Sequence, residues 1–479
     1  MIKKFIQKVF GGKSPETAQK RSGPQGVAGV GKQRIYSRAE HGIHREDLSN
    51  AAISVCEGLQ NAGYEAFVVG GAVRDLLLGR HPKDFDIATN ATPEQVRGVF
   101  RRARIIGRRF RLVHVMFRDE TIEVSTFRSN HSDPEADENN ARADEHGRLL
   151  RDNVFGNQEE DAIRRDFTMN ALFYDPAKQE VLDYVHGVAD VQKKRVVMIG
   201  DPEARYREDP VRMLRAARLA SKLEFSIDAA TEKPIATLAP LLDNVPTARL
   251  YDEMIKLLMS GHALSGLAKL RHLGLHRGIL PVLDNLFNDA HSSAFVTLSL
   301  QRTDQRISEE KGVSPAFLFA ALFWHPMMAR WEKLEAAGTR NAQAMHEAMD
   351  EILDEQRKTL AIPRRLDPLI KEIWVAQPRF LQRSKVKAYR NLAHPRFRAA
   401  YDFFALRAEA GDADTEVADW WERFQFTDDD TRETMLLPDD EPKKNKRRRR
   451  KKKSTGSTPA DATAGDASAS EAGPVTDDH

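Results

Sequence analysis

The sequence predicts an α+β chain, in which a mixed sheet with interspersed helices is followed by a part built from helices alone. Up to about Tyr184, short apolar runs such as EAFVVGG and RLVHVMFRD alternate with helical segments. Beyond about Gly187, apolar residues recur at three- and four-residue spacing, and strand-like runs are few. With 479 residues and 41% hydrophobic content, the chain is long enough for two or three domains.

The first forty residues are expected to lie outside the fold. MIKKFIQKVF has apolar residues at helical spacing and lysines on the other side, which is typical of a small basic amphipathic helix. Such a helix either docks on its own protein or makes weak contact with an anionic membrane surface. A linker containing Gly, Ser and Pro follows, so we expect residues 1–40 to be flexible and the fold to begin near His41.

Helices and strands then follow in a readable order through the sheet domain, residues 41–186. HREDLSNAAISVCEGLQNAG predicts a helix, EAFVVGG a buried strand, AVRDLLLG a short helix and KDFDIATN a second strand. TPEQVRGVFRR predicts a helix capped by Thr92, with Pro93 at its first position. RLVHVMFRD and ETIEVSTFR predict a hairpin, and the polar stretch Asp133–Asn153 predicts a long mobile loop.

The remainder predicts a helical neck over residues 187–260 and a helical body over 261–430. The expected helices include REDPVRMLRAARLASKL, TARLYDEMIKLLMSG, SPAFLFAALFWHPMMARWEKLEAA, NAQAMHEAMDEILDEQRKTL and HPRFRAAYDFFALRAEAG. Phe397, Arg398 and Tyr401 have the chemistry to grip RNA, but core packing is the preferred interpretation.

A basic run near the C-terminus carries most of the positive charge. The formal net charge is +3, and ten of the eleven residues in Lys443–Lys453 are basic, which leaves the rest of the chain at about −7. RNA phosphates are the preferred partner, with a solubilising tail and a membrane-surface tail as alternatives. The predicted RNA-binding residues are Lys443, Lys444, Lys446, Arg447, Arg448, Arg449, Arg450, Lys451, Lys452 and Lys453. Residues 431–479 are expected to be disordered.

Cysteine usage points to a reducing compartment. Cys56 is the only cysteine, which excludes an internal disulfide and a cysteine-based zinc site. The sequence has no run of eighteen apolar residues. We therefore expect a cytoplasmic protein, in which any metal is held by carboxylates or histidines.

Two aspartates on the predicted strand KDFDIATN carry the clearest chemical signal. Asp84 and Asp86 are two apart, so both would project from one face while Phe85 points into the core. A divalent cation between them would relieve their repulsion, and Mg²⁺ favours carboxylates together with substrate phosphate oxygens. An isolated Asp-x-Asp is usually a solvated face, so this signal depends on its neighbours.

A glycine turn precedes the two aspartates. Gly70 and Gly71 let the backbone approach a phosphate at the start of a helix, Arg74 can reach that phosphate, and Asp75 can orient the arginine. A lone Gly-Gly is usually only a turn. In this order, however, the turn and the paired carboxylates indicate two-metal nucleotidyl transfer, in which one ion activates a hydroxyl and the other neutralises pyrophosphate.

A third carboxylate is expected in such a site. Glu123 has suitable strand geometry, because Ile122 and Val124 face the other way, whereas Asp166 follows Arg164 and Arg165. The choice between Glu123 and Asp166 stays open.

Five motifs follow one another over most of Gly63–Phe225: GGAVRD, DFDIATNATPEQV, IEVSTFR, EEDAIRRDFTMNALFYD and YREDPVRMLRAARLASKL. In this order and at this spacing they resemble the motifs of the class II tRNA nucleotidyltransferase/poly(A) polymerase superfamily. IIGRRFRLVHVMF, Ile105–Phe117, looks like the element of the bacterial poly(A) polymerase branch, and the basic tail agrees with it. The resemblance implies a palm-like nucleotidyltransferase sheet followed by an all-α neck and an RNA-binding body.

The resemblance also implies roles for individual residues. Asp84 and Asp86 would be the catalytic metal ligands, and Asp166 matches a catalytic acidic residue. The remaining residues implied to bind the nucleotide are Gly70, Gly71, Arg74 and Asp75 at the triphosphate, and Arg128, Arg165 and Asn170 near the sugar and phosphates. The E-D-x-x-R segment, with Glu208, Asp209 and Arg212, would read the base edge.

Residue chemistry supports the last role in part. Asp209 can accept a hydrogen bond from an exocyclic amine and Arg212 can donate to ring nitrogens, so side chains would replace a template strand. Arg215 and Arg218 continue the spacing of Arg212, advancing around a helix by about 60° per step, and are predicted to bind the nucleotide. A merely basic solvated helix is the alternative.

The function predicted is template-independent addition of AMP from ATP to RNA 3′ ends, promoting RNA turnover. The expected cofactor is Mg²⁺ at a two-metal site, with Mn²⁺ as a substitute. We expect a monomer that binds ATP and RNA 3′ ends and contacts proteins of RNA decay. A CCA-adding tRNA nucleotidyltransferase is the alternative within enzymes. A non-catalytic RNA-binding adaptor is the alternative outside enzymes. The presence of all the predicted acidic residues argues against it.

Overall fold

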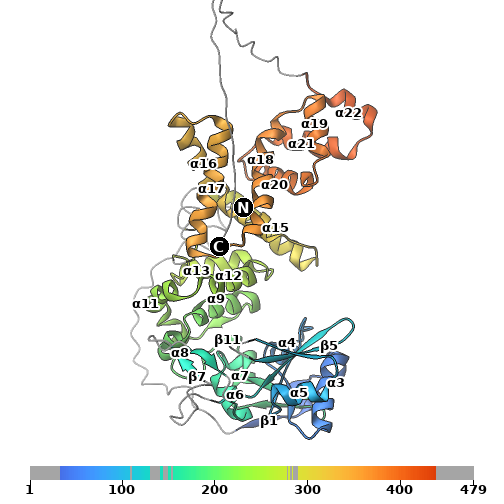
Figure 1. The fold of residues 1–479 in the computed structure, drawn as a ribbon, viewed down its shortest axis with the longest axis vertical. Coiled ribbons are helices and arrows are strands. Elements are labelled where there is room, and N and C mark those ends of the chain that lie inside the picture. Colours follow the sequence, from blue (N-terminus) through green and yellow to red (C-terminus); the bar gives the residue numbers. More distant parts are fainter. Residues whose placement is uncertain are drawn as a thin grey trace, which may run out of the picture.

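In the computed structural model the chain folds into a head built on a mixed sheet, from which a column of helices rises (Figure 1). The structure describes residues 33–438, apart from 108–110, 130–140, 144–148, 153–154, 278, 281–282 and 284–289. The expected helix Met1–Phe10 and the basic run Lys443–Lys453 lie outside the described residues. In the described part of the chain, no helix combines the length and the apolar character needed to cross a membrane.

An eight-stranded sheet forms the head, in the order β1-β10-β9-β2-β3-β6-β5-β4. Its strands are β1 (Arg34–Tyr36), β2 (Ala66–Val69), β3 (Asp86–Thr89), β4 (Ala103–Ile106), β5 (Leu112–Met116), β6 (Thr121–Thr126), β9 (Leu172–Asp175) and β10 (Glu180–Asp183). β3 and β6 run parallel, and all other neighbouring pairs are antiparallel. The predicted mixed sheet and the β5–β6 hairpin are confirmed.

Both faces of the sheet centre are covered. Helices α3 (Asn50–Asn61) and α5 (Pro93–Val99) pack on one face, over the buried Val68 and Ile87. On the other face Phe67 packs with a second apolar cluster that includes Ala162 of α6 (Gln158–Arg164). This two-sided burial explains why β2 is a continuous apolar run instead of an alternating one.

The fold begins earlier than the sequence predicted. β1 pairs with β10, with Ile35 opposite Leu182, and α2 (Arg38–His41) follows it, so residues 34–40 belong to the head. A three-residue strand carries too short a pattern to be recognised, and its partner lies far along the chain.

Local signals set the other boundaries of the head. The Thr92 hydroxyl accepts a hydrogen bond from the Gln95 N–H, and Pro93 starts α5, as predicted, but the helix already ends at Val99. The stretch Asp133–Asn153, expected to be a mobile loop, contains the paired strands β7 (Ala141–Ala143) and β8 (Leu149–Asp152), and its other residues lie outside the described ones.

The column above the head is helical, as predicted. Its lower part contains α8 (Pro202–Glu208), α9 (Val211–Leu223), α10 (Ala229–Glu232), α11 (Ile235–Leu238), α12 (Thr247–Leu258) and α13 (Ala263–His272). The predicted neck was expected to start at residue 187, but α7 (Gly187–Gln192) lies in the head, against α4 (Gly71–Leu77) and the turn Thr168–Asn170 (Figure 1). Its upper part contains α15 (Ala290–Ser308), α16 (Pro315–Ala336), α17 (Asn341–Thr359), α18 (Asp367–Ala376), α19 (Lys385–Leu392), α20 (Phe397–Glu409), α21 (Thr415–Phe426) and α22 (Asp429–Met435). The one departure is a short parallel ladder between β11 (Arg195–Val196) and β12 (Ser226–Ile227).

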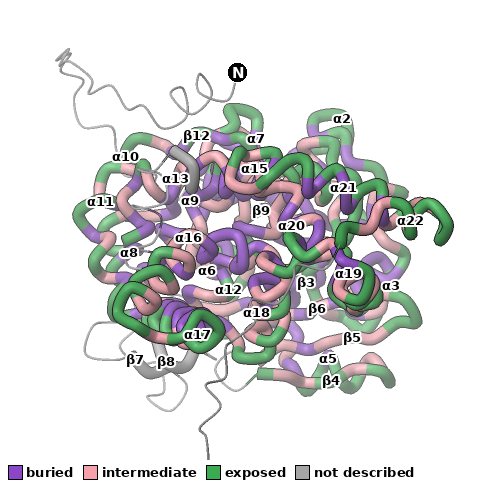
Figure 2. Tube along the Cα trace, turned by 90° about the horizontal axis from the view of Figure 1, so that it is seen from above, coloured by how far each residue is buried: buried purple, intermediate pink, exposed green. Residues whose placement is uncertain are grey.

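In the view along the long axis, buried residues gather towards the middle, whereas residues of the peripheral helix α22 are mostly exposed (Figure 2). At the upper end Phe397 stacks on Tyr401, with ring centroids 5.9 Å apart, and both rings are buried with Trp421. These aromatic residues therefore pack a core, which is the preferred interpretation. The body extends past residue 430, because Leu437 still bridges to Ser384.

Candidate active site

The glycine turn between β2 and α4 (Gly71–Leu77) lies beneath two guanidinium groups. Gly70 has φ +71°, a left-handed conformation that favours glycine. A Cβ at Gly70 would lie 3.3 Å from Nη1 of Arg165, and one at Gly71 would lie 3.5 Å from Nη2 of Arg74. The Gly70 N–H donates to the Leu172 carbonyl, 3.0 Å away, so it is not free for a phosphate as the sequence suggested. The cations supply the positive charge here.

Arg74 is held in place by two neighbours. Its Nε and Nη2 donate to Oδ1 of Asp75 at 2.9 and 2.7 Å, and its Nη1 donates to Oδ1 of Asn170 at 2.6 Å. The Arg74 side chain is buried, so its rotamer is restricted by packing as well. The expected contact between Asp75 and Arg74 is present, and their role at a triphosphate stays a prediction.

The two aspartates of the DFD motif do not share a strand. β3 begins at Asp86, and Asp84 precedes it in the connecting segment, although Phe85 points into the core as expected. β3 has only four residues, and irregular backbone precedes it. Asp84 is therefore not held in the pleated geometry that would have aligned its side chain with that of Asp86.

Asp86 and Glu123 are brought together by the sheet. They are paired residues on the parallel strands β3 and β6, so their side chains project from the same face. Loss of hydration raises the pKa of Asp86 most, the charges of Glu123 and Asp84 add to this and Arg165 opposes it, so that the pKa is about 6. Carboxylates that repel one another in this way form a site that a divalent cation would stabilise.

Asp166 has a different environment. Its Oδ2 accepts from Nε of Arg215 at 2.7 Å, and its Oδ1 accepts from the Phe167 N–H and from Asn170. Burial would raise the pKa of Asp166, but the charge and hydrogen bonds of Arg215, with those of Asn170 and Phe167, lower it to about 2. Asp166 therefore anchors α9 to the head, which favours Glu123 as the third carboxylate beside Asp84 and Asp86.

Of the two arginines Arg165 and Arg128, only Arg165 lines the cavity. Arg165 donates from Nε and Nη2 to Oδ2 of Asp161, at 3.1 and 2.8 Å, and lines the cavity described below. The backbone N–H of Arg128 donates to the other oxygen of Asp161, but Arg128 does not line that cavity. The two predicted phosphate ligands thus share a carboxylate without sharing the site.

The predicted base-reading segment faces the head from the start of α9. Arg212 donates from Nη1 to Oε2 of Glu208 at 2.7 Å, and Arg205 binds the same oxygen at 2.7 Å. Burial would raise the pKa of Glu208, but these two arginines hold it below its usual value. Asp209 is bound by Arg249 of α12, through distances of 3.1 and 2.9 Å to its two oxygens.

Sequence reasoning missed the contribution of α12. Glu253 is buried and accepts from Nε of Arg218 at 2.9 Å, while Arg215 lies 3.7 Å and Lys256 3.5 Å from its other oxygen. Arg249, Glu253 and Lys256 are spaced at i, i+4 and i+7, a polar stripe on an otherwise amphipathic helix. This spacing of polar residues could have identified α12 as part of the site from the sequence.

These groups surround a cavity of about 620 Å³ between the head and the neck. Its lining includes the glycine turn and the following charged residues: Arg74, Arg165, Arg212, Arg215, Arg218, Lys222, Arg249 and Lys256 as cations, and Asp86, Asp166, Asp209, Asp252 and Glu253 as acids. The volume suits one nucleotide. The surplus of cations suits a polyanionic group, so the cavity has the chemistry of a nucleoside triphosphate site.

The described residues contain no group of three or more His, Cys, Asp or Glu side chains that could hold a metal ion. Asp84, Asp86 and Glu123 therefore do not form a complete protein cage. Mg²⁺ usually takes one or two carboxylates and completes its octahedron with water and substrate phosphates, so the pair of Asp86 and Glu123 would suit it without a third acidic ligand.

Family profiles match most of the chain. The profile described as the poly A polymerase head domain matches residues 66–197. A profile described as a probable RNA and SrmB-binding site of polymerase A matches residues 224–287, and one described as the polymerase A arginine-rich C-terminus matches residues 337–454. The three matches follow the order of head, neck and body.

Known proteins resemble the chain along its length. Poly(A) polymerase I of Salmonella typhimurium is 45% identical over 431 residues, covering 88% of this chain and 91% of the relative. A CCA-adding enzyme of Lactobacillus helveticus is 37% identical over 217 residues, covering 45% of this chain and 52% of the relative. The solved structure of the Bacillus stearothermophilus CCA-adding enzyme in complex with CTP superimposes with a TM-score of 0.55 at 27% identity, covering 78% of this chain and 80% of that one.

Proposed function

Because the chain belongs to the poly(A) polymerase I family, we propose that it adds AMP from ATP to RNA 3′ ends without a template. It is a polynucleotide adenylyltransferase, and its substrates are nucleotide and RNA. The observation that carries the proposal is the single cavity that joins the glycine turn and Asp86 in the head to Asp209 and Arg212 in the neck. One nucleotide can span these two ends.

The finer chemical assignment concerns the metal. Asp84, Asp86 and Glu123 would hold Mg²⁺, or Mn²⁺ in its place, with oxygens of the substrate completing the coordination. When bound, the metal activates the attacking hydroxyl and neutralises charge on the leaving pyrophosphate. The raised pKa of Asp86, which comes first from loss of hydration and then from the charges of Glu123 and Asp84, supports the fit, because a bound cation would offset both effects.

Protein cations would position the triphosphate. Arg74 and Arg165 lie over the glycine turn, and Lys222 and Arg218 line the same cavity. Guanidinium groups bind phosphate oxygens in a fixed geometry, and those of Arg74 and Arg165 are already restrained by Asp75 and Asp161. Such preorganisation favours transfer, because the charges need not move as the reaction proceeds.

Adenine would be selected by the neck. Asp209 keeps acceptor capacity for an exocyclic amine while Arg249 binds it, since each carboxylate oxygen has two lone pairs. Arg212 is oriented by Glu208 and can donate to a ring nitrogen. Because both readers are held by partners, the pocket presents one pattern at every addition, which favours repeated incorporation of the same base.

The decisive experiment separates this activity from CCA addition. Purified protein is given an unstructured RNA with Mg²⁺ and each nucleotide separately, and then a tRNA lacking its terminal CCA with ATP and CTP. Long tails from ATP alone on the unstructured RNA are expected, with poor use of CTP. Addition of C, C and then one A, confined to tRNA, would establish the alternative. The adaptor hypothesis predicts no incorporation and has no support among the full-length relatives, which are named as polymerases.

Other partners remain proposals. The run Lys443–Lys453 would bind RNA phosphates, and the helix Met1–Phe10 would touch the protein itself or an anionic membrane surface. Cytoplasmic location is a further proposal, which the single cysteine favours. A monomeric state and contacts with proteins of RNA decay are proposals as well.

A further inference from the structure

A row of polar side chains crosses the open part of the sheet next to the proposed metal ligands. Glu123 on β6 is paired with Asp86 on β3 and, on its other side, with His114 on β5. His114 in turn is paired with Arg104 on β4, the edge strand. Residues paired across neighbouring strands project from the same face, so these four side chains form one line from the centre of the head to its edge.

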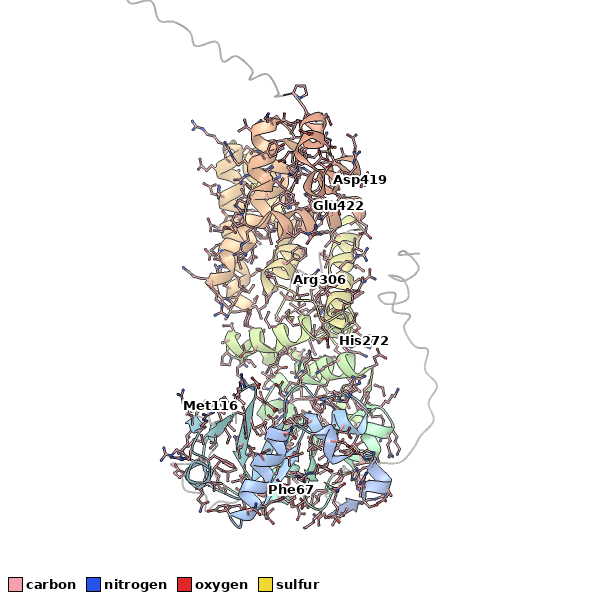
Figure 3. All side chains as sticks on the ribbon, turned by 90° about the vertical axis from the view of Figure 1, so that its right-hand side faces the viewer. Phe67, Met116, His272, Arg306, Asp419 and Glu422 are labelled. Carbon is pink, nitrogen blue, oxygen red and sulfur yellow. The ribbon has the colours of Figure 1, made fainter. Side chains whose placement is uncertain are left out.

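This face of the hairpin is open to solvent. The alternate residues Val113, Val115 and Val124 are buried on the opposite face, where they pack under α3 and α5. The side chains of His114 and Glu123 are 36% and 42% exposed, and Nε2 of His114 lies 3.6 Å from Oε2 of Glu123. Figure 3 places Met116, which shares the face of His114 at the end of β5, at the edge of the head nearer the helical column.

Positive charge gathers where the row ends. Arg101, Arg102 and Arg104 are exposed, and none of them forms an ion pair with a carboxylate of the described residues. Cations on an edge strand also prevent edge-to-edge association, which would account for Arg101 and Arg102. That explanation does not account for His114, which lies two strands from the proposed metal ligand Asp86 and away from the edge.

The row and the nucleotide cavity lie on opposite flanks of β3. The cavity is lined by Asp86 and by residues of the glycine turn after β2, but not by Glu123, His114 or Arg104. In the sheet, β2 lies on one side of β3, and β6, β5 and β4 follow on the other. In nucleotidyl transfer the attacking hydroxyl and the leaving pyrophosphate lie roughly in line on opposite sides of the reacting phosphorus.

We infer that the 3′-terminal nucleotides of the RNA lie across β6, β5 and β4, with His114 hydrogen-bonded to the terminal ribose and Arg104 bound to a backbone phosphate upstream. The inference rests on the proposed function, because the nucleotide must occupy the cavity for the open flank to receive the primer. Either ring nitrogen of an imidazole can hydrogen-bond a ribose hydroxyl, and an unpaired arginine suits a phosphate. This strand path gives the RNA end a binding surface separate from the basic tail.

The phosphate contact is tested by RNA binding in the absence of ATP, measured across salt concentrations. Arg104→Ala is expected to weaken binding of a single-stranded RNA and to reduce the slope of log affinity against log salt by about 0.7, the value for one phosphate contact. Arg118→Ala is the matched control, since Arg118 is 94% exposed on the β5–β6 turn and lies outside the row. Equal slopes for the two variants would overturn the assignment of Arg104.

The ribose contact is tested by kinetics. His114→Ala is expected to reduce kcat/KM for RNA by about fivefold, the effect of one hydrogen bond, while the KM for ATP stays unchanged. His114→Gln retains a hydrogen-bonding group and is expected to recover part of the loss. An equal rise in the KM for ATP in both variants would place His114 in the nucleotide site instead and overturn the inference.

Cross-linking locates the RNA on the protein without depending on catalytic turnover. The wild-type protein is irradiated with an RNA that carries 4-thiouridine next to its 3′ end, and the linked peptides are identified by mass spectrometry. Cross-links within β4 (Ala103–Ile106) and β5 (Leu112–Met116) are expected, and cross-links confined to α9 and α12 would overturn the inference. If the wild-type protein fails to extend RNA with ATP, the proposed function fails, and the cross-linking result still reports where RNA lies.

Discussion

The Asp166 carboxylate in the head is bound by the Arg215 guanidinium in the neck, with Nε 2.7 Å and Nη2 2.6 Å from the same Oδ2. The Asp166 side chain is only 10% exposed, and Glu253 approaches Arg215 from α12. One arginine thus connects the head, α9 and α12 across the cavity. The pair is a structural joint between the end of the site that is proposed to bind metal and the end that is proposed to read the base.

Breaking this joint is expected to destabilise the protein. Asp166→Ala should lower the free energy of unfolding by about 2 kcal/mol, because it leaves the half-buried Arg215 with only the more distant Glu253 as a partner. Denaturant unfolding measures the change. Arg207→Ala is the control: Arg207 forms a pair with Glu203 at 2.7 Å, but both side chains are more than half exposed, so a loss under about 1 kcal/mol is expected. Similar losses in the two variants would contradict the role of Asp166 as an anchor.

The proposed metal ligands give the second prediction. Asp84→Asn or Asp86→Asn alone should abolish most nucleotide incorporation, because each removes a charge from the metal site, while fold and RNA affinity remain near wild type. Primer extension and equilibrium RNA binding measure the two properties separately. Near-normal turnover in either variant would contradict the two-metal mechanism.

The pKa of Asp86 gives a prediction with a definite sign. Its folded-state pKa of about 6 is above the value of about 3.9 for an unfolded aspartate, so charging it disfavours the folded state as pH rises through 6. In metal-free buffer, Asp86→Asn should therefore raise the melting temperature at pH 7.5, with little effect at pH 3.5, where Asp86 is protonated in both states. Thermal melts of both proteins at the two pH values measure this, and a variant less stable than wild type at pH 7.5 would refute the shift.

The Mg²⁺ requirement should depend on the ionisation of Asp86. Because a carboxylate must be ionised to bind Mg²⁺, the concentration of Mg²⁺ needed for half-maximal incorporation should rise as pH falls from 7 towards 5. Glu123→Gln should raise that concentration at pH 7 as well. Arg207→Ala, which lies outside the site, should leave it unchanged. A metal requirement that is the same at pH 5 and pH 7 would argue against Asp86 as a ligand.

Arg249 provides a prediction about base selection. Arg249→Ala removes the group that holds Asp209, so the base reader becomes mobile and discrimination between ATP and CTP should fall about tenfold. The ratio of kcat/KM values for the two nucleotides on one RNA measures it. A variant that loses activity equally with both nucleotides would show that Arg249 supports catalysis without contributing to selection.

The basic tail is tested by deletion. Removing Lys443–Lys453 should weaken RNA binding and flatten its salt dependence, because fewer counterions are released, while incorporation at saturating RNA stays nearly unchanged. An unchanged salt slope would favour a solubilising or membrane-surface role for the tail.

Structural features that depend on neighbouring residues in the sequence were predicted correctly. The buried strand β2, the cap of α5 by Thr92 and the β5–β6 hairpin all lie where their patterns placed them. Each depends on neighbours within a few positions, so the chain carries the whole signal. The placement of Asp84 on β3 was wrong, because strand ends depend on pairing partners elsewhere in the sheet.

The sequence by itself determined the fold class, the order of head and helical column, and the glycine turn and acidic residues of the site. Only the tertiary structure decided which groups share that site. It brought α12 against α9, so that Arg249 holds Asp209 and Glu253 holds Arg218, and it paired Asp86 with Glu123 across parallel strands. Side chains this far apart in the chain meet only when buried apolar surfaces fix the packing of helices and strands, and a local pattern contains no record of that packing.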